Sequence, residues 1–344
     1  MAETTFPKPV DLRELTRSIE QELKDFRLFY KEIIATKVPL LDQLLRYLWR
    51  QKGKEVRPIL VFMTAKLFGD ISKRTFIAAT MIELLHTATL IHDDVIDEAD
   101  SRRGFLSINK LWKNKAGVLL GDFMLSKGLL ISLDHKEYIL LKILSDAVRQ
   151  MSEGELRQLK TSKLQNMTEE RYFEIISEKT ASLIAACCHC GAESVLGDGS
   201  TESKDAIRLK EAGLKIGVAF QIKDDLLDYG TDDIGKPKRN DIQERKITLP
   251  LIMALQHAPS KEATAMRRLF RKRKKSSKEV EQIVEFVHRY QGIGASEAKM
   301  RSFMNEAVSD IRLHPLLKET ADPKRLQAIE EFNGLLTFIM NRKS

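Results

Sequence analysis

Two copies of one short acidic motif carry the side chains best suited to chemistry in this chain. The first is Asp93-Asp94-Val95-Ile96-Asp97, and the second, 131 residues further on, is Asp224-Asp225-Leu226-Leu227-Asp228. On an α-helix, residues i, i+3 and i+4 share a face, so each motif directs three carboxylates the same way. Carboxylates crowded in this manner repel one another unless a cation lies between them. Mg²⁺ is usually held by one or two carboxylates together with substrate phosphates, so the two motifs predict a magnesium site rather than a solvated acidic surface.

Basic residues precede and follow the first acidic motif. Lys54 and Arg57 stand upstream of it, and Arg102 and Arg103 follow it after a predicted turn. Arginine binds phosphate oxygens through paired hydrogen bonds, whereas lysine acts as a point charge. Taken alone, Arg102 and Arg103 could equally form surface salt bridges with nearby acidic residues. Together with metal ions, these cations indicate a receptor for a diphosphate group.

The helix that carries the second motif is expected to pack closely on a neighbour. Gly213, Gly217 and Gln221 precede the motif on the same face. Glycine in a helix costs about 1 kcal/mol relative to alanine, so two on one face indicate close approach. The approaching group is either a neighbouring helix, the commoner case, or a ligand lying along the face. Beyond the motif, Lys236 and Lys246 bring two further cations to the same end.

The elements that position these residues are predicted to be helices. No proline, which would break a helix interior, occurs between Pro58 and Pro237. A helix is expected to open after Pro58, and residues 197–201 are expected to form a turn, with Thr201 or Ser203 as the next helix cap. Apolar residues recur at helical spacing in segments 81–97, 119–133, 140–159, 171–195 and 206–229, and a last helix is expected over 323–340. No linker divides the chain, so we predict one all-α domain over residues 1–344, with the two acidic helices facing each other across a cavity.

Composition limits the class of protein and its partners. The chain has 344 residues, of which 43% are hydrophobic and 31% charged, as in an ordinary soluble globular protein. It has no uninterrupted apolar run of about 18 residues and does not begin like a signal peptide, so we expect a cytoplasmic protein. The net charge of +8 fits an anionic partner. The basic run 267–275 lacks the aromatic residues of a nucleic-acid groove, and we expect a solvated surface there rather than a nuclear signal or a lipid-headgroup patch.

The cysteines do not predict a metal centre. Cys187, Cys188 and Cys190 are adjacent to His189 on one predicted helix. Their side chains would point in different directions and cannot close around zinc without a second cluster, which the sequence lacks. We expect small buried residues instead. Nucleophile-elbow, phosphate-loop and dinucleotide motifs are also missing, so the common enzyme alternatives lack a sequence signal.

The residues around both acidic motifs resemble those of trans-polyprenyl diphosphate synthases of the isoprenoid synthase family. Residues 84–97, followed by Arg102-Arg103-Gly104, are similar to the first aspartate-rich region of that family, and residues 217–229 are similar to the second. The similarity covers roughly residues 39–250. It implies a helical bundle around a central cavity, with residues 251–344 as a helical C-terminal part of the same domain.

The resemblance also implies what each group of residues does. A cluster of about three Mg²⁺ ions would be bound with the substrate diphosphate by Asp93, Asp97 and Asp224, and directly or through water by Asp94, Asp225 and Asp228. Isopentenyl diphosphate would be held by Lys54, Arg57, His86 and Arg103. The allylic diphosphate would be held by Arg102, Lys236 and Lys246, and the developing cation would lie near Lys179, Thr180 and Gln221.

One segment departs from the pattern of the family. Where that pattern has Gly-Gly-Lys-Arg-x-Arg-Pro, this chain has Lys52 in place of the first glycine and Glu55 in place of the first arginine. Lys54 and Arg57 are retained. The change therefore bears on the geometry of the loop rather than on the expected activity.

These roles imply a prenyltransferase that extends an allylic diphosphate with isopentenyl diphosphate. Cations would stabilise the diphosphate leaving group while an allylic carbocation forms in a dry pocket. A silent subunit of a heteromeric synthase would usually lack part of the aspartate or basic set, and a terpene cyclase would normally lack the second motif and the Lys54/Arg57 site. The resemblance further implies a homodimer, quinone side chains as the destination, membrane contact for product release and no nucleic-acid partner.

Product length is expected to depend on residues below the metal site. Thr89 and Ala88 lie four and five residues before Asp93, about one helical turn down. In family members with short products an aromatic ring fills this level, whereas both residues here are small. We therefore expect an open tunnel and a product of hexaprenyl to decaprenyl length, with Leu84 or Leu85, a turn deeper, as candidates for the stop.

Overall fold

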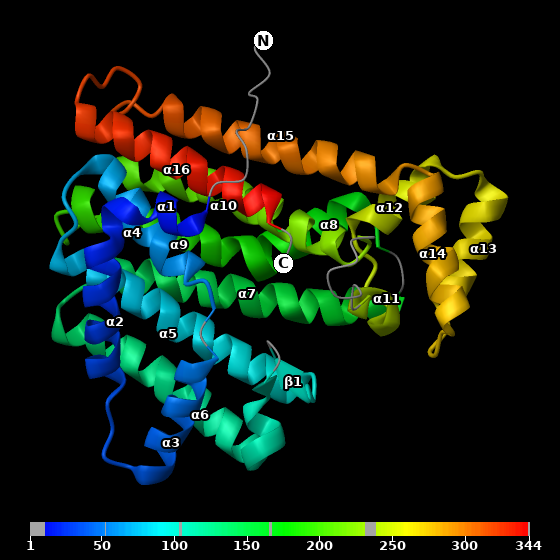
Figure 1. The fold of residues 1–344 in the computed structure, drawn as a ribbon, viewed down its shortest axis with the longest axis horizontal. Helices are drawn as coiled ribbons and strands as arrows, with labels where there is room; N and C mark the ends of the chain where they lie inside the picture. The colour runs from blue at the N-terminus through cyan, green and yellow to red at the C-terminus, as the bar shows by residue number, and fades with distance from the viewer. Residues whose placement is uncertain (1–10, 52, 103–104, 165–166, 231–238, 343–344) are drawn as a thin grey trace.

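The computed structural model describes residues 11–342 except 52, 103–104, 165–166 and 231–238. Within these residues it is a helical bundle, with strands only in a short antiparallel hairpin of β1 (Ser101–Arg102) and β2 (Phe105–Leu106). The all-α class predicted from the sequence is thereby confirmed. Long helices run across the molecule, and α13 and α14 project at one end (Figure 1).

The helices follow one another along the chain with short connections. They are α1 (Leu12–Leu15), η1 (Arg17–Ile19), α2 (Glu20–Ile34), α3 (Pro39–Arg50), α4 (Val56–Phe68), α5 (Lys73–Ile96), α6 (Ile108–Asp134), α7 (Tyr138–Leu164), α8 (Glu169–Ile176), η2 (Ser177–Ala181), α9 (Ser182–Leu196), α10 (Lys204–Leu227), α11 (Asn240–Glu244), α12 (Leu249–His257), α13 (Ser260–Phe270), α14 (Ser277–Arg289), α15 (Gly292–Arg312) and α16 (Pro323–Asn341). Here η1 is a 3₁₀ turn and η2 a π-helical turn.

Every predicted helix is present, but several are longer than expected. α4 begins at Val56, before Pro58, and α7 spans Tyr138–Leu164 rather than residues 140–159. α5 begins at Lys73 rather than at residue 81, and α6 begins at Ile108 rather than at residue 119. The start of α6 is bent at Lys113, which has a φ of 70°, so its first turns do not continue the apolar spacing of the rest. The predicted helix 171–195 is also divided, because η2 separates α8 from α9.

The turn before α10 has the form expected from its polar residues. The Asp198 carboxylate accepts hydrogen bonds from the backbone N–H groups of Ser200 and Thr201 at 2.8 and 3.2 Å. Ser203 is the N-cap of α10, and its hydroxyl accepts a hydrogen bond from the Ala206 N–H at 3.3 Å. Of the two candidate caps, Ser203 is therefore the one in use.

The glycine face of α10 packs against a neighbouring helix. A Cβ atom at Gly213 would lie 2.8 Å from Ala185 Cα in α9, and one at Gly217 would lie 2.5 Å from Ala181 Cα in η2. These distances are far below van der Waals contact, so only glycine permits this approach. The group that approaches the glycine pair is thus a neighbouring helix, not a ligand.

The cysteines of α9 are buried, as expected. Cys187, Cys188 and Cys190 belong to the main hydrophobic core. His189 is 1% exposed, and burial lowers its pKa from 6.5 to about 4. These residues therefore act as small side chains of the hydrophobic core, not as a metal site.

Two helices, α5 and α6, are long and apolar enough to be candidate membrane spans. This was not predicted from the sequence, because neither helix contains an uninterrupted apolar run of about 18 residues. α5 has 67% of its most apolar window buried inside the protein, whereas α6 has only 39% buried. α5 is therefore a core helix, and α6 presents an apolar face on the surface.

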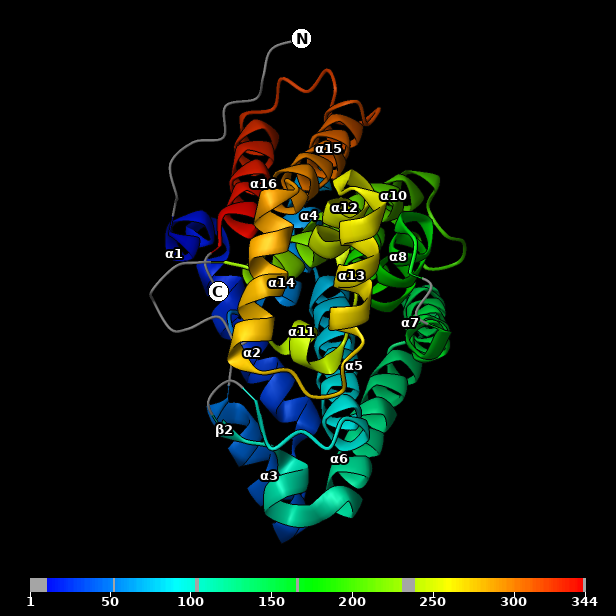
Figure 2. The ribbon, with the colours of Figure 1, turned by 90° about the vertical axis from the view of Figure 1, so that its right-hand side faces the viewer.

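The C-terminal ends of α5 and α10 lie at the same end of the bundle, where α11 crosses in front of them (Figures 1 and 2). α13 and α14 stand beside this end and share a small second core with α11 and α12, formed around Ile242, Leu251, Phe270 and Ile283. The acidic motifs are thus carried to one end of the molecule by two apolar helices.

Candidate active site

The first acidic motif occupies the last turn of α5. Asp97 is the C-cap, and its backbone N–H donates to the Asp93 carbonyl oxygen at 2.8 Å. Asp94 is 6% exposed and lines, together with His86, a small pocket that faces α2 and α3. Asp93 is half-buried and Asp97 is exposed. The end of α5 therefore presents carboxylates to both sides of the helix. The prediction that the three carboxylates of this motif share one face is wrong for Asp94, because that side chain is buried towards α2 and α3.

The second motif occupies the last turn of α10, and its central carboxylate is buried. Asp225 accepts hydrogen bonds from the Tyr172 hydroxyl at 2.6 Å and from Gln221 Nε2 at 2.8 Å. Burial raises the pKa of Asp225 to about 8, although both hydrogen bonds favour its charged form. Asp225 therefore fixes Tyr172 of α8 to α10 at the base of the site.

Asp228 organises the short helix α11. Its two carboxylate oxygens accept the backbone N–H groups of Asn240 and Asp241, each at 3.1 Å. Burial raises the pKa of Asp228, and these backbone donors oppose that shift. A carboxylate at the first turn of a helix also interacts favourably with the helix dipole, so α11 is held against the end of α10.

Charges from the two motifs meet at Lys246. Burial alone would lower the pKa of its ammonium group, but the hydrogen bond that it donates to Glu244 at 2.7 Å and the charges of Glu244, Asp241 and Asp97 together raise that pKa. Because Asp97 belongs to the first motif and Asp241 is held by the second, one cation lies within reach of both. Of the six motif aspartates, however, only Asp225 lines the cavity beside Lys246. That the two motifs face each other across one cavity therefore stays a prediction.

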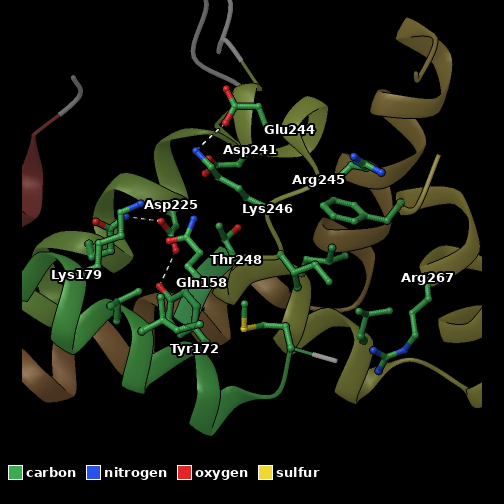
Figure 3. Close-up of a pocket in the computed structure, with 18 of the residues that line it drawn as sticks. Gln158, Tyr172, Lys179, Asp225, Asp241, Glu244, Arg245, Lys246, Thr248 and Arg267 are labelled. Atoms are coloured by element: carbon green, nitrogen blue, oxygen red, sulfur yellow. Dashed lines mark hydrogen bonds and ion pairs between the residues drawn. The ribbon is translucent and has the colours of Figure 1, made fainter. Parts of the chain in front are cut away.

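Asp241 is a site residue that sequence reasoning missed. It lines a cavity of about 590 Å³ together with Asp225 and Lys246 (Figure 3). Burial raises its pKa to about 6, and the charge of Asp228 adds to the shift. A lone aspartate on a five-residue helix has no periodic signal, so only its position beside the second motif identifies it.

Three residues predicted to lie near the developing cation line the same cavity. Lys179 and Thr180 belong to the π-helical turn η2, and Gln221 lies one turn before the second motif. π-Helical turns inside α-helices occur frequently at functional sites. Lys179 forms an ion pair with Glu155 of α7, which approaches closely because Gly154 has no side chain; a Cβ there would lie 2.8 Å from Lys179 N.

The departure at Glu55 is matched by a cation. Glu55 is the N-cap of α4 with a φ of 51°, between the phosphate-binding candidates Lys54 and Arg57. Arg27 of α2 donates to one Glu55 carboxylate oxygen from Nε at 2.9 Å and from Nη2 at 2.7 Å. The negative charge that replaces the arginine of the family is thus paired, which leaves this region basic.

A second unpredicted contact joins the C-terminal segment to the second motif. Arg342 Nη2 lies 2.6 Å from Asp224 Oδ1 and donates to the Phe220 carbonyl oxygen at 3.2 Å. Its guanidinium group stacks on the Phe220 ring at 3.8 Å. A single arginine near the end of a chain rich in basic residues gave no sequence signal.

Some predicted residues cannot be placed. Arg103 and Lys236, like Lys52, lie outside the described residues, and Arg102 is described only as backbone in β1. The chain-length candidates lie inside the bundle: Ala88, Leu84 and Leu85 are buried in α5, and the Thr89 hydroxyl donates to the His86 carbonyl oxygen at 2.9 Å. Their effect on product length stays a prediction.

The donor set of the site fits Mg²⁺. Its candidate ligands are carboxylate oxygens, which hard divalent cations prefer. The guanidinium group of Arg342 on Asp224 shows that this carboxylate accepts a cation. Among the described residues, no three acidic, histidine or cysteine side chains lie close enough to hold a metal ion unaided. Bound Mg²⁺ would therefore depend on oxygen atoms of the substrate as well.

Comparisons with known proteins agree with this geometry. The polyprenyl synthetase family pattern matches residues 38–287. Octaprenyl diphosphate synthase of Escherichia coli (strain K12) is 34% identical over 260 residues, 75% of this chain and 79% of that protein. A decaprenyl diphosphate synthase from Rhodobacter capsulatus superimposes with a TM-score of 0.85 at 28% identity, covering 96% of this chain and 99% of that one. A polyprenyl synthase from Caulobacter crescentus CB15, complexed with calcium and isoprenyl diphosphate, has a TM-score of 0.84 at 29% identity, covering 98% and 100%.

The family pattern spans more than half of the chain, and the similarity in fold extends over nearly all of it. Both findings confirm the resemblance inferred from the two acidic motifs, including the isoprenoid synthase fold. The chain therefore belongs to the polyprenyl synthetase family, the trans-polyprenyl diphosphate synthases.

Proposed function

We propose that this chain is a Mg²⁺-dependent enzyme that extends an allylic diphosphate by successive trans head-to-tail condensations with isopentenyl diphosphate, releasing diphosphate. The observation that carries the proposal is the position of Lys246. It lines the cavity together with Asp225, and the charges of Asp97 and Asp241 both act on its ammonium group. The calcium and isoprenyl diphosphate bound to the Caulobacter crescentus protein support it.

Mg²⁺ held by Asp93, Asp97 and Asp224 with the substrate would neutralise charge on the diphosphate that leaves. Lys246 contributes a further positive charge at that end. In the proposed reaction the allylic C–O bond breaks, a C–C bond forms to isopentenyl diphosphate, and a proton is lost to restore a double bond. The chain must therefore stabilise positive charge on carbon until the new bond forms.

The walls of the cavity suit that task. The Thr180 hydroxyl and the Gln221 side-chain oxygen are polar groups that can face an allylic cation without forming a covalent bond. Ile175, Ile176 and Leu251 form apolar walls next to them. Such walls limit the access of water, which would otherwise capture the cation.

Isopentenyl diphosphate would bind on the other side of the first motif. Lys54 and Arg57 lie at the start of α4, and His86 faces the pocket beside Asp94. In this arrangement the two substrates approach each other across the end of α5. Arg102, Arg103 and Lys236 are proposed to complete the diphosphate contacts.

We also propose a homodimer formed through α6. This helix exposes Leu119, Leu129, Leu130 and Leu133, each with at least 50% of its surface accessible. Contiguous apolar surface of this kind commonly marks a protein interface. The Leu129→Glu/Leu133→Glu variant should shift the mass measured by light scattering from dimer to monomer; a wild-type monomer would contradict the proposal.

For the product we propose a chain of hexaprenyl to decaprenyl length, made in the cytoplasm, released with membrane contact and used for quinone side chains. The small residues Ala88 and Thr89 below the metal site support the length. The test is to incubate purified protein with Mg²⁺, isopentenyl diphosphate and dimethylallyl, geranyl or farnesyl diphosphate in turn, and to size the dephosphorylated products. Elongation that stops at geranylgeranyl, or release of a cyclic hydrocarbon, would contradict the proposal.

A further inference from the structure

The basic run 267–275 divides into two sets when it is placed on the fold. Arg267 and Arg271 lie one residue beyond the buried Met266 and Phe270 of α13, so these four side chains form one stripe that lines the 590 Å³ cavity. All five basic side chains Arg267, Arg268, Arg271, Arg273 and Lys274 are exposed, but Arg268, Arg273 and Lys274 do not line the cavity. The run is therefore more than the solvated surface expected from the sequence.

Arg245 adds a third guanidinium group to this side of the cavity. We call Arg245, Arg267 and Arg271 the arginine wall. Figure 3 shows Arg245 and Arg267 across the cavity from Lys179 and Asp225. In the part of the chain that the structure describes, no carboxylate forms an ion pair with any member of the wall. The nearest acidic residue in sequence, Glu244, pairs with Lys246 instead.

The arginine wall is held in place by the second core. Phe270 packs with Ile242 of α11 in that core. Just beyond α13, Lys275 is buried and donates to the Ile242 carbonyl oxygen at 2.8 Å, with its ammonium group 5.1 Å from the centre of the Phe270 ring. Burial lowers the pKa of Lys275, and the charge of Arg245 adds to that effect. The charges of Lys275 and Arg245 therefore repel each other, and an anion beside them would reduce that repulsion.

Part of the lining of the same cavity is an apolar surface. It includes Ile175, Leu251, Leu255 and Met266. A cavity with guanidinium groups at one side and an apolar surface beside them matches an amphipathic anion, since guanidinium binds phosphate oxygens in pairs and an aliphatic chain covers the apolar part. Its volume of about 590 Å³ is in the usual range for a small-molecule site.

We propose that the arginine wall is a second diphosphate site, separate from the metal site, that binds the head of a prenyl diphosphate whose chain lies over the apolar surface. The inference rests on the proposed function, because that reaction produces such a molecule in the same cavity. A phospholipid shares this chemistry of phosphate and aliphatic chain. We favour the prenyl diphosphate because the arginine wall lines the same cavity as Lys179 and Gln221, whereas Arg268, Arg273 and Lys274 do not.

The test uses the full-length protein and farnesyl S-thiolodiphosphate, an analogue that does not ionise readily, titrated calorimetrically with EDTA present. Without metal the aspartate motifs should bind the analogue poorly, so the part of the remaining binding that depends on Arg267 and Arg271 reports the arginine wall. We expect Arg267→Gln/Arg271→Gln to weaken this binding about tenfold or more, as charge-assisted hydrogen bonds are lost. The matched control Arg268→Gln/Arg273→Gln removes the same charge and should change it less than about threefold.

Two further ligands identify what the site recognises. Inorganic diphosphate should bind at least about tenfold more weakly than the analogue, because it lacks the chain. The arginine wall should not bind phosphatidylglycerol vesicles. The proposal would be overturned if both double variants weakened vesicle binding equally and the analogue did not bind in EDTA. That result would assign the basic run to a membrane. Equal weakening of analogue binding by both double variants would also overturn the proposal.

Condensation of isopentenyl diphosphate by the wild-type protein with Mg²⁺ is measured separately. Elongation without metal-independent binding of the analogue refutes only the second site. Binding of the analogue without any elongation refutes the proposed function. The thermal midpoints of both double variants should match the wild type, which excludes unfolding as the cause of weaker binding.

Discussion

The Gly217→Ala substitution should damage catalysis more than it damages the fold. A Cβ at Gly217 would lie 2.5 Å from Ala181 Cα, 2.7 Å from Ala181 Cβ and 3.0 Å from the Ala181 carbonyl oxygen. Carbon atoms in contact prefer about 3.5 Å or more, so α10 and η2 must separate by about 1 Å. Overpacking of this kind costs about 1–3 kcal/mol, and the gain in helix propensity offsets about 1 kcal/mol. We expect a net loss of about 1 kcal/mol in the free energy of unfolding.

The displacement acts where it matters most for chemistry. Ala181 directly follows Lys179 and Thr180, and Gly217 lies one turn before Gln221, so both walls of the cation site move apart. A misplacement of about 1 Å can lower the turnover rate about 100-fold. Urea unfolding and single-turnover condensation measure the two effects separately.

Gly213→Ala is the matched control. Its Cβ would also be crowded, at 2.8 Å from Ala185 Cα, but it lies one turn further from the catalytic residues. It should cost similar stability while lowering turnover less than about tenfold. A Gly217→Ala enzyme with wild-type turnover, or equal losses of turnover in the two variants, would refute the assignment of η2 to the active site.

Three further changes test other parts of the structure. Ala88→Phe should shorten the longest product seen by chromatography, because a ring would fill the level below the metal site; an unchanged product ladder would place the floor elsewhere. Burial lowers the pKa of His189 from 6.5 to about 4. Below pH 6.5 the unfolded chain therefore binds a proton at this residue that the folded chain does not. As a result, the free energy of unfolding should drop by about 2 kcal/mol between neutral pH and pH 5. His189→Gln should lose less in urea unfolding, and an equal loss would contradict this cause. Arg27→Ala should raise KM for isopentenyl diphosphate about fivefold, roughly 1 kcal/mol, with kcat nearly unchanged, because Glu55 loses its cation beside the diphosphate site. If the charge swap Arg27→Glu/Glu55→Arg does not restore KM, the ion pair is not the cause.

Sequence reasoning reached the fold class and the two acidic helices because both depend on local patterns. The apolar spacing of residues 81–97 and 206–229 identifies both segments as helices of the core, and the aspartates lie at their C-terminal ends. Gly213 and Gly217 were recognised as points of close contact. Whether a helix or a ligand approached them depended on tertiary packing, and the structure answers that with η2 and α9.

The missed features all depend on long-range contacts. Arg342 reaches Asp224 across 118 residues, and Asp241 joins the site only because Asp228 binds the first N–H groups of α11. The π-helical turn at Lys179 adds one residue to a helical turn without disturbing the apolar pattern around it. Such features follow from the assembled structure and leave no periodic signal in the sequence.

The central claim is that the two acidic motifs act together on a magnesium diphosphate. Its most direct test is the steady-state condensation rate of the Asp93→Asn/Asp224→Asn variant with saturating Mg²⁺, farnesyl diphosphate and isopentenyl diphosphate, with circular dichroism to verify the helical fold. We predict a loss of at least about 1,000-fold, because metal-bound charge contributes several kcal/mol to the transition state. A folded variant with near wild-type turnover would contradict the magnesium assignment.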